Sequence, residues 1–454
     1  MGKPAELTPT TFLTLLRESG LVAPDQLQSA LVDAPTGERA KALARFLIKR
    51  GLLTRFQAQQ LLAGRTGGFF LGQYRILDML GRGGMGKVYK AEHMTMARLV
   101  ALKVLNSDVT RTERARELFR REVRAAARLV HPNIATAFDA NEVNGRAFLV
   151  LEYVAGPSLS HLVKSGAPLP IGQACELIRQ AAVGLQHAHE RGMVHRDIKP
   201  SNLLIGYQQF PISTKPESDW STADGNLPVV LKIVDFGLAL LPTALGNDDT
   251  LEPDRHVVLG TPDYLSPEQA TDIRSVDIRS DLYSLGCTFY YLLTGQPPFP
   301  GGTAMEKLHR HASEEPVPIE FHRPSVPPGV AAAVRKLLAK RPQDRFQTPF
   351  DLADTLAEFA EVRPVNWIDD RRTTGDDLVV PEEGEPEVGS SAGGAMSGTL
   401  SLAEIASTLD AAQRAGSDPV IRPARWHSTL LFMAAIAAGF LTGAILIVSA
   451  LLKR

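Results

Sequence analysis

The sequence predicts an α+β protein that consists of an all-helical N-terminal module, a region in which strands precede helices, and one C-terminal transmembrane helix. Three observations support this prediction. Apolar residues recur at helical spacing in the first 66 residues, strand-type alternation begins at Tyr74, and residues 430–452 carry no charge. With 454 residues, the chain is long enough for two or three domains.

The composition excludes several classes of protein. Lys and Arg total 49 and Asp and Glu total 50, so the chain lacks the basic field that attracts nucleic acid. A hydrophobic fraction of 44% is typical of a globular protein and not of a disordered chain. Cys175 and Cys287 are too few for a disulfide framework, which fits a reducing cytosol.

The N-terminal module, residues 5–66, contains an internal repeat. The motif Gly20-Leu-Val, with Gln26 six residues after the glycine, recurs as Gly51-Leu-Leu with Gln57. Each glycine follows apolar residues at helical spacing and can end a helix, so two helix-turn-helix units are expected. Such a module either caps the next domain or binds a partner, and the sequence is compatible with both roles.

A glycine-rich segment follows the first expected strand. Residues 80–88 read Leu-Gly-Arg-Gly-Gly-Met-Gly-Lys-Val. A Gly-x-Gly-x-x-Gly pattern that opens a helix indicates dinucleotide binding, but here β-type residues continue after the glycines. We therefore expect a hairpin that folds over a nucleotide, because glycines let the backbone approach phosphate oxygens closely.

Two charged residues come next. Lys103 ends the apolar strand Val100-Ala-Leu-Lys, where its ammonium can hold phosphate oxygens. Glu122 lies in a strongly basic helix, beside the apolar residues Phe119 and Val123. An inward-facing carboxylate at this position can form an ion pair with the lysine.

Three further motifs point to phosphoryl transfer. They are His-Arg-Asp-Ile-Lys-Pro-Ser-Asn at 195–202, Asp-Phe-Gly at 235–237 and Ser-Pro-Glu at 266–268. Phosphoryl transfer needs metal ligands, a group that orients the attacking hydroxyl, and cations against the phosphates. Over residues 74–359 the chain resembles the eukaryotic-like Ser/Thr protein kinases of bacteria. The resemblance implies a bilobal protein kinase fold, with a small β-rich N-lobe and a helical C-lobe, over residues 74–361.

The resemblance also implies a role for each catalytic residue. Asp197 would orient the substrate hydroxyl and accept its proton, and Lys199, placed as in Ser/Thr kinases, would contact the γ-phosphoryl group. The metal ligands of the two Mg²⁺ ions would be Asn202 and Asp235.

The ATP site follows from the same resemblance. Lys103 would pair with Glu122 and contact the α- and β-phosphates, and Leu151 would be the gatekeeper beside the adenine. The other ATP-contacting residues would be Leu80, Gly81, Gly83, Gly86, Val88, Ala101, Glu152, Val154 and Leu204. Residues with structural roles would be Glu268 paired with Arg345, Asp281 supporting the catalytic loop, and Thr261 near Asp197.

Two segments depart from the family pattern. Residues 207–228 form an insertion, which is either a surface loop or a contact for a partner or substrate. The activation segment has apolar residues where relatives often carry threonines, although Arg196 implies a cation that awaits a phosphate. Thr243 and Thr250 are therefore the regulatory candidates.

The C-terminal part is expected to be a disordered linker followed by a membrane span. Residues 362–427 are rich in Gly, Ser, Pro and Ala. Residues 430–452 would form a helix of about 34 Å, which matches a hydrocarbon core of about 30 Å. Because ATP is cytosolic, we expect a single-pass tail anchor in the cell (inner) membrane with the kinase domain in the cytoplasm. Gly439 and Gly443 form a small-residue stripe that suggests a homodimer.

These features predict a membrane-tethered, non-specific Ser/Thr protein kinase that uses ATP and Mg²⁺, acts on protein substrates and autophosphorylates. Two alternatives are a pseudokinase scaffold and a small-molecule kinase of similar fold. The presence of Lys103, Asp197, Asn202 and Asp235 disfavours the pseudokinase. The Ser-Pro-Glu segment together with Thr261 disfavours the small-molecule kinase.

Overall fold

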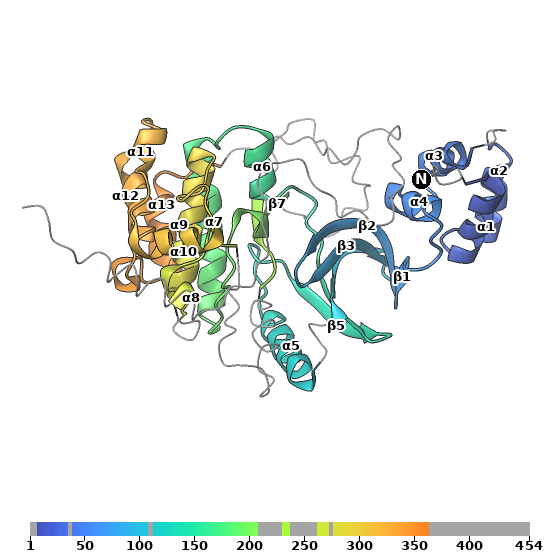
Figure 1. The fold of residues 1–454 in the computed structure, drawn as a ribbon, viewed down its shortest axis with the longest axis horizontal. Coiled ribbons are helices and arrows are strands. Elements are labelled where there is room, and N and C mark those ends of the chain that lie inside the picture. The colour runs from blue at the N-terminus through green and yellow to red at the C-terminus, as the bar shows by residue number, and fades with distance from the viewer. Residues whose placement is uncertain are drawn as a thin grey trace, which may run out of the picture. The chain divides into compact units, whose positions relative to one another are not determined.

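The computed structural model describes residues 7–34, 39–107, 112–207, 229–236, 261–271 and 276–362 (Figure 1). The N-terminal module contains α1 (Pro9–Ser19), α2 (Pro24–Leu31), α3 (Ala40–Lys49) and α4 (Arg55–Leu62). These helices form the two helix-turn-helix units that the repeat predicts. Gly20 ends α1 with φ +66°, a left-handed conformation that a glycine adopts without strain. The module has its own apolar core around Phe12, Leu16 and Leu47.

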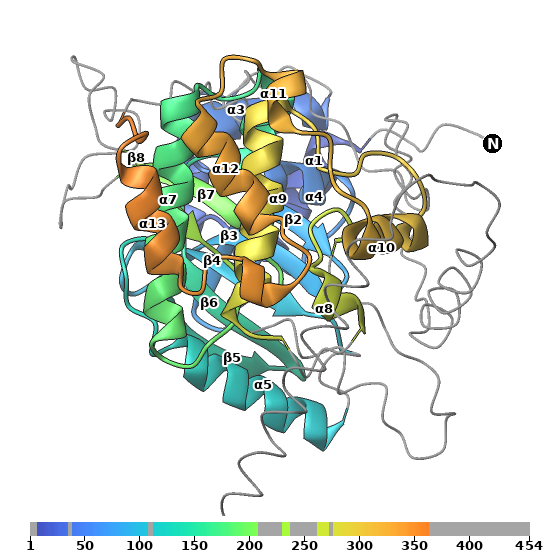
Figure 2. The same cartoon turned by 90° about the vertical axis from the view of Figure 1, so that its left-hand side faces the viewer.

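The N-lobe is a six-stranded antiparallel sheet with strand order β1-β2-β3-β4-β6-β5. Its strands are β1 (Phe70–Leu71), β2 (Tyr74–Gly83), β3 (Gly86–His93), β4 (Arg98–Leu105), β5 (Ala137–Val143) and β6 (Arg146–Glu152). Helix α5 (Glu113–Ala126) lies beside β5 (Figure 2). The expected glycine-rich hairpin is present, because Gly83 pairs with Gly86. A side chain at Gly86 is excluded, since its Cβ would lie 2.0 Å from the Val104 carbonyl oxygen.

The C-lobe is mainly helical, as expected. Its elements are α6 (Leu159–Ser165), α7 (Ile171–His189), β7 (Leu203–Tyr207), β8 (Val229–Ile233), α8 (Pro267–Thr271), α9 (Ile278–Thr294), α10 (Ala304–Ser313), α11 (Ile319–His322), α12 (Pro328–Leu337) and α13 (Pro349–Ala357), with 3₁₀ turns at Pro200–Asn202 and Pro342–Asp344. Helix α9 is buried nearly all round and forms the centre of the lobe.

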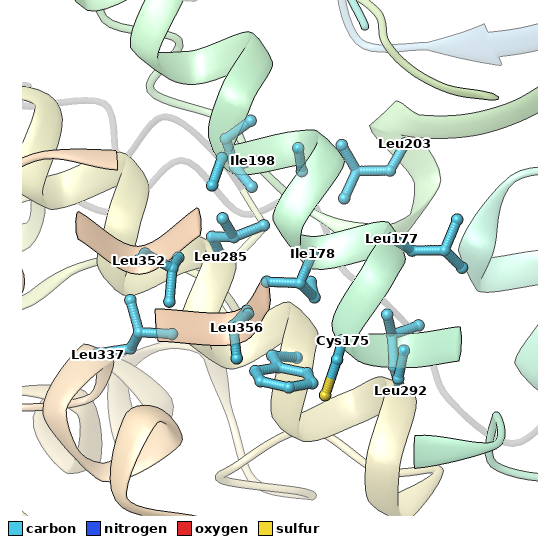
Figure 3. Close-up of a cluster of buried hydrophobic side chains, with 14 of the residues drawn as sticks. Cys175, Leu177, Ile178, Ile198, Leu203, Leu285, Leu292, Leu337, Leu352 and Leu356 are labelled. Carbon is cyan, nitrogen blue, oxygen red and sulfur yellow. The ribbon is translucent and has the colours of Figure 1, made fainter. Parts of the chain in front are cut away.

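One continuous apolar core supports the catalytic loop. Side chains of α7, α9, α12 and α13 interlock in this core, and α13 lies along α7 (Figures 2 and 3). Ile198 of the catalytic loop and Leu203 of β7 point into the same cluster and are almost fully buried (Figure 3). Because protein interiors are close-packed, apolar contacts with this cluster hold the loop that carries Asp197 in place.

Several predictions fall on residues outside the described ranges. They concern most of the insertion, Thr243, Thr250, the linker beyond Val362, and the span at 430–452 with Gly439 and Gly443. Within the ranges that the structure describes, we find no helix with the length and apolar character needed to cross a membrane.

Candidate active site

A buried carboxylate holds the start of the catalytic loop. Asp281, at the beginning of α9, accepts hydrogen bonds from the backbone N–H groups of His195 and Arg196, both at 2.7 Å. Burial raises the pKa of Asp281, and these donors and nearby positive charges offset only part of that effect. Arg196 has φ +68°, a strained conformation for a residue with a side chain. The loop-supporting role expected for Asp281 is confirmed by this geometry.

His195 links the catalytic loop to the strand that precedes Asp235. Its Nδ1 accepts from the Asp197 backbone N–H at 3.2 Å, so Nε2 carries the proton and donates to the Val234 carbonyl at 2.9 Å. The His195 side chain is fully buried. The imidazole therefore connects the backbone at Asp197 to the backbone next to Asp235 and helps to fix the distance between the two aspartates.

The catalytic-loop side chains converge on Asp197. The Asn202 amide nitrogen Nδ2 donates to Asp197 Oδ2 at 3.1 Å and to the Asp197 carbonyl at 2.8 Å. Lys199 Nζ lies 2.8 Å from Asp197 Oδ2 and donates to Thr261 Oγ1 at 3.0 Å. Thr261 thus lies next to the catalytic loop, as expected.

Lys103 of β4 crosses from the N-lobe to Asp235. Its Nζ lies 2.9 Å from Asp235 Oδ1. Burial by itself raises the pKa of Asp235, but the Lys103 ammonium lowers it below its usual value. Asp235 has φ +68°, so this ion pair holds a strained backbone.

The expected ion pair between Lys103 and Glu122 is not formed, because Lys103 pairs with Asp235 among the described residues. Burial raises the pKa of Glu122, and the charges of Arg196 and Arg121 offset only part of this effect. Helix α5, which carries Glu122, borders a cleft of about 450 Å³ on its β5 side.

Most of the expected adenine-contacting residues gather in one apolar cluster. Ala101 and Leu151 are buried there, and Leu80 and Val88 pack against them. Leu204 lies on β7 of the C-lobe. The glycines Gly81 and Gly83 are at the end of β2, where the hairpin turns.

The family resemblance implies that Glu152 and Val154 form the hinge between the lobes, and Glu152 is held in place by hydrogen bonds. Its carboxylate accepts from Lys232 Nζ of β8, with contacts of 2.8 and 2.9 Å, and from the Thr136 backbone N–H at 3.1 Å. Val154, the second residue of the expected hinge, lies against Gly206, where an added Cβ would be 3.3 Å from Val154 Cγ1.

The expected pair of Glu268 and Arg345 is confirmed. Arg345 NH1 and NH2 donate to Glu268 Oε1 and Oε2 at 2.7 and 2.9 Å, and the Arg345 side chain is fully buried. Burial raises the pKa of Glu268, but the Arg345 hydrogen bond and charge lower it overall. This bidentate pair joins α8 to the segment before α13.

Three contacts at the site were not anticipated from the sequence. Gln269 Nε2 donates to the Arg196 carbonyl at 2.8 Å, Lys307 pairs with Asp263 at 2.6 Å, and Lys232 holds the hinge as described. Because Gln269 directly follows the Ser-Pro-Glu motif, its place in the sequence could have indicated a contact with the catalytic loop. The partners of the two lysines are far away in the sequence and left no local pattern.

Comparison with known proteins agrees with this geometry. A family model described as protein kinase domain matches residues 74–355. Serine/threonine-protein kinase PknB of Mycobacterium leprae is 36% identical over 296 residues, which cover 64% of this chain and 44% of that protein. Serine/threonine-protein kinase pkn2 of Myxococcus xanthus is 38% identical over 290 residues, which cover 63% of this chain and 32% of that protein.

The chain thus spans less than half the length of these curated relatives. Among solved structures, the PknI kinase domain of Mycobacterium tuberculosis has 27% sequence identity and a TM-score of 0.47, and the match covers 64% of this chain and 98% of that one. Because the family model matches more than half of the chain and includes every motif of the site, the chain belongs to the protein kinase family.

Proposed function

We propose that the chain is a serine/threonine protein kinase that transfers the γ-phosphoryl group of ATP to Ser and Thr hydroxyls of protein substrates. The observation that carries this proposal is the position of Lys199 between Asp197 Oδ2 and Thr261 Oγ1. A cation between a proton acceptor and a threonine can hold a transferring phosphoryl group beside an incoming hydroxyl. The names of the two bacterial relatives support the hydroxyl specificity.

In this reaction the substrate hydroxyl oxygen bonds to the γ-phosphorus, the bond to the β,γ-bridging oxygen breaks, and ADP leaves. Asp197 orients the hydroxyl and accepts its proton on a carboxylate oxygen. Asn202 holds that carboxylate from one side, and His195 holds the Asp197 backbone. Lys199 supplies positive charge beside the oxygens of the phosphoryl group that is being transferred.

The residues Asn202 and Asp235 fit Mg²⁺ bound together with ATP. Asn202 directs its Nδ2 toward Asp197, which leaves the amide oxygen as the group available to a cation. Asp235 has a lowered pKa and is ionised at neutral pH. Amide and carboxylate oxygens are hard ligands that suit Mg²⁺. When bound, the metal neutralises charge on the phosphates.

The nucleotide would lie between the lobes. Leu80, Val88 and Ala101 would contact one face of the adenine, and Leu204 the other. The backbone of Glu152 and Val154 would bind the adenine edge, and Gly81, Gly83 and Gly86 would cover the phosphates. The apolar cluster that contains Leu80, Val88 and Ala101 supports this placement.

Glu122 is proposed to pair with Lys103 when nucleotide and metal are bound. The metal would then engage Asp235, which currently holds the lysine. The raised pKa of Glu122 supports this exchange, because the charges of Arg196 and Arg121 offset only part of the cost of burying this carboxylate. Lys103, so held, would contact the α- and β-phosphates.

The function is tested by incubating the purified chain with γ-labelled ATP and protein substrates, followed by phosphoamino-acid analysis. We expect phosphoserine and phosphothreonine. Asp197→Asn should reduce transfer by about 10²–10⁴-fold while the protein stays folded. Asp235→Asn should also abolish transfer. Phosphotyrosine as the main product, or transfer that Asp235→Asn leaves unchanged, would contradict the proposal.

The proposed domain organisation is a helical module at 5–66, a kinase domain at 74–361 with an insertion at 207–228, a linker at 362–427 and a membrane span at 430–452. The uncharged run supports the span, and the cytosolic location of ATP supports a cytoplasmic kinase domain.

A homodimer through Gly439 and Gly443 is proposed as the active arrangement in the membrane. Small residues four apart let two helices approach closely, and a tether raises the effective concentration of one kinase domain near another. Replacing both glycines by Ile should keep insertion and slow autophosphorylation at low protein density. An unchanged rate would exclude this role for the stripe.

A further inference from the structure

Helix α4 of the N-terminal module is docked on the edge of β2. Both elements belong to one compact unit, and α4 lies beside β2 (Figure 1). Strand β1 pairs only with Tyr74 and Arg75, so the β2 edge beyond them has no strand partner in the described sheet. The Ile76 N–H donates to the carbonyl of Phe69, which directly precedes β1 and packs in the module core, at 2.8 Å.

A β-bulge turns two consecutive carbonyls of β2 toward α4. Ile76 is opposite Ala91 and Asp78 is opposite Lys90, so Leu77 is the extra residue on β2. In a regular strand, neighbouring carbonyls point to opposite edges. Here the carbonyls of Ile76 and Leu77 both accept hydrogen bonds from α4.

The donors are the two residues that also cap α4. Gln57 Nε2 donates to the Ile76 carbonyl at 2.7 Å, and Thr54 Oγ1 donates to the Leu77 carbonyl at 2.6 Å. Thr54 Oγ1 also accepts from the Gln57 backbone N–H, and Gln57 Oε1 accepts from the Thr54 backbone N–H. Gln57 is 3% exposed, so its amide group makes these two hydrogen bonds, to Thr54 and to Ile76, away from solvent.

The first copy of the repeat lacks this contact. Gln26 occupies the position of Gln57 but is exposed to solvent, and Ala23 replaces Thr54 as the cap of α2 and provides no side-chain hydrogen bond. The two copies therefore share a helical framework, and the second carries the polar pair that reaches the sheet.

The docked bulge lies close to the nucleotide flap. Leu80 follows Leu77 by three residues and packs in the expected adenine cluster, and the hairpin glycines begin at Gly81. Phe56 of α4 also meets Tyr89 of β3 edge to face, with ring centroids 6.3 Å apart. Leu80 is the extra residue of a second bulge, because Met79 is opposite Tyr89 and Gly81 is opposite Val88. A one-residue slip of β2 at Leu77 would change the residues that enter this second bulge and the flap.

We propose that Thr54 and Gln57 are positioning residues for nucleotide binding. They hold the bulge of β2, and the bulge sets the register and direction of the glycine-rich flap. The module is then a working part of the ATP site. This inference rests on the proposed function, since it assigns the hairpin to ATP.

The test is made in the full chain and separates two roles of Thr54 and Gln57, which are to cap α4 and to bind the carbonyls of β2. Thr54→Asp and Gln57→Glu keep the oxygens that cap α4 but remove the donors to Leu77 and Ile76. We expect the KM for ATP to rise about five- to tenfold in each variant, with kcat changed less than about twofold. Thr54→Ser keeps the hydroxyl and should restore the parent KM. Gln26→Glu, at the matched exposed position, should have no effect.

Equilibrium binding of Mg-ATP distinguishes this inference from the proposed function. A parent chain that binds ATP but transfers nothing would refute the kinase activity, while the weaker ATP binding of Thr54→Asp would still support positioning. The proposal is overturned if folded Thr54→Asp and Gln57→Glu bind ATP as tightly as the parent chain. It is also overturned if Thr54→Ser fails to restore binding.

Discussion

Lys103 and Asp235 form an ion pair with 2.9 Å between Nζ and Oδ1, so the expected phosphate-binding lysine holds the expected metal ligand. The pair joins β4 of the N-lobe to Asp235, two residues after the end of β8 in the C-lobe. It also accounts for the lowered pKa of Asp235. Glu122, the carboxylate expected at the lysine, is left partly buried near Arg196.

This arrangement predicts that two substitutions at the site differ in their effect on stability although both slow transfer. Glu122→Gln should leave the free energy of unfolding of the nucleotide-free protein unchanged or raise it by up to about 1 kcal/mol, because it removes a carboxylate destabilised by burial. The same change should slow transfer at least tenfold. Lys103→Met should reduce both stability and transfer. Urea unfolding and labelled-ATP assays measure the two quantities, and a large stability loss in Glu122→Gln would contradict the structure.

The buried pair of Glu268 and Arg345 predicts a large stability effect. Arg345→Met should cost about 3–5 kcal/mol of unfolding free energy, since it leaves the Glu268 charge without its partner. Arg341→Met is the matched control, because the Arg341 and Asp344 side chains are 71% and 56% exposed at 3.7 Å. That exposed pair should contribute less than about 1 kcal/mol. Equal losses in the two variants, measured by urea unfolding, would contradict this prediction.

His311 predicts a pH dependence of stability. Its side chain is fully buried beside Tyr283, and burial lowers its pKa to about 3. In the unfolded chain a histidine titrates near pH 6.5, so as the pH falls the unfolded state binds a proton before the folded state does. The contribution of His311 to stability is therefore full above pH 6.5 and decreases as the pH falls toward 3. Between pH 7 and pH 5 the titration of His311 should lower the free energy of unfolding by roughly 2 kcal/mol.

His311→Gln should therefore show a smaller fall in unfolding free energy between pH 7 and pH 5 than the parent chain. His161→Gln, at an exposed position, should keep the parental slope. If His311→Gln and the parent lose stability in parallel, the neutral buried imidazole is not the source of the pH dependence.

Activation through Thr243 or Thr250 predicts a slow double alanine variant. Arg196 supplies a cation beside the catalytic loop, and its Nε is buried without a hydrogen-bond partner among the described residues. After complete dephosphorylation and renewed incubation with ATP, the parent should speed up and the variant should remain slow. A variant that recovers the parental rate would show that another residue orders the activation segment.

The membrane proposal predicts that location and catalysis can be separated. Removing the residues after Arg425 should release an active soluble kinase, because the uncharged run would be absent and every motif would remain. Protease added to intact cells should spare the kinase domain of the full chain. Digestion from outside, or a truncated protein that stays integral to the membrane, would refute this topology.

Local motifs were enough to locate most of the site, and the family resemblance that they carry supplied the role of each residue. Asp197, Lys199 and Asn202 lie within six consecutive residues, so their convergence follows from one short loop. The glycine hairpin and the helical repeat likewise follow from residue types and periodicity over a few turns or strands. The two lobes were predicted from the family resemblance. The Glu268 and Arg345 pair, 77 residues apart, was anticipated through the family resemblance.

The partners of several side chains depend on the three-dimensional arrangement of distant elements. Lys103 pairs with Asp235 of the other lobe, at 2.9 Å, and not with Glu122, which is much nearer in the sequence. Gln26 and Gln57 have the same place in the repeat, yet only Gln57 meets a bulged strand edge with two carbonyls turned outward. Hydrogen bonds and ion pairs weaken steeply within an ångström or two, and such distances are set by packing between elements that no local sequence pattern records.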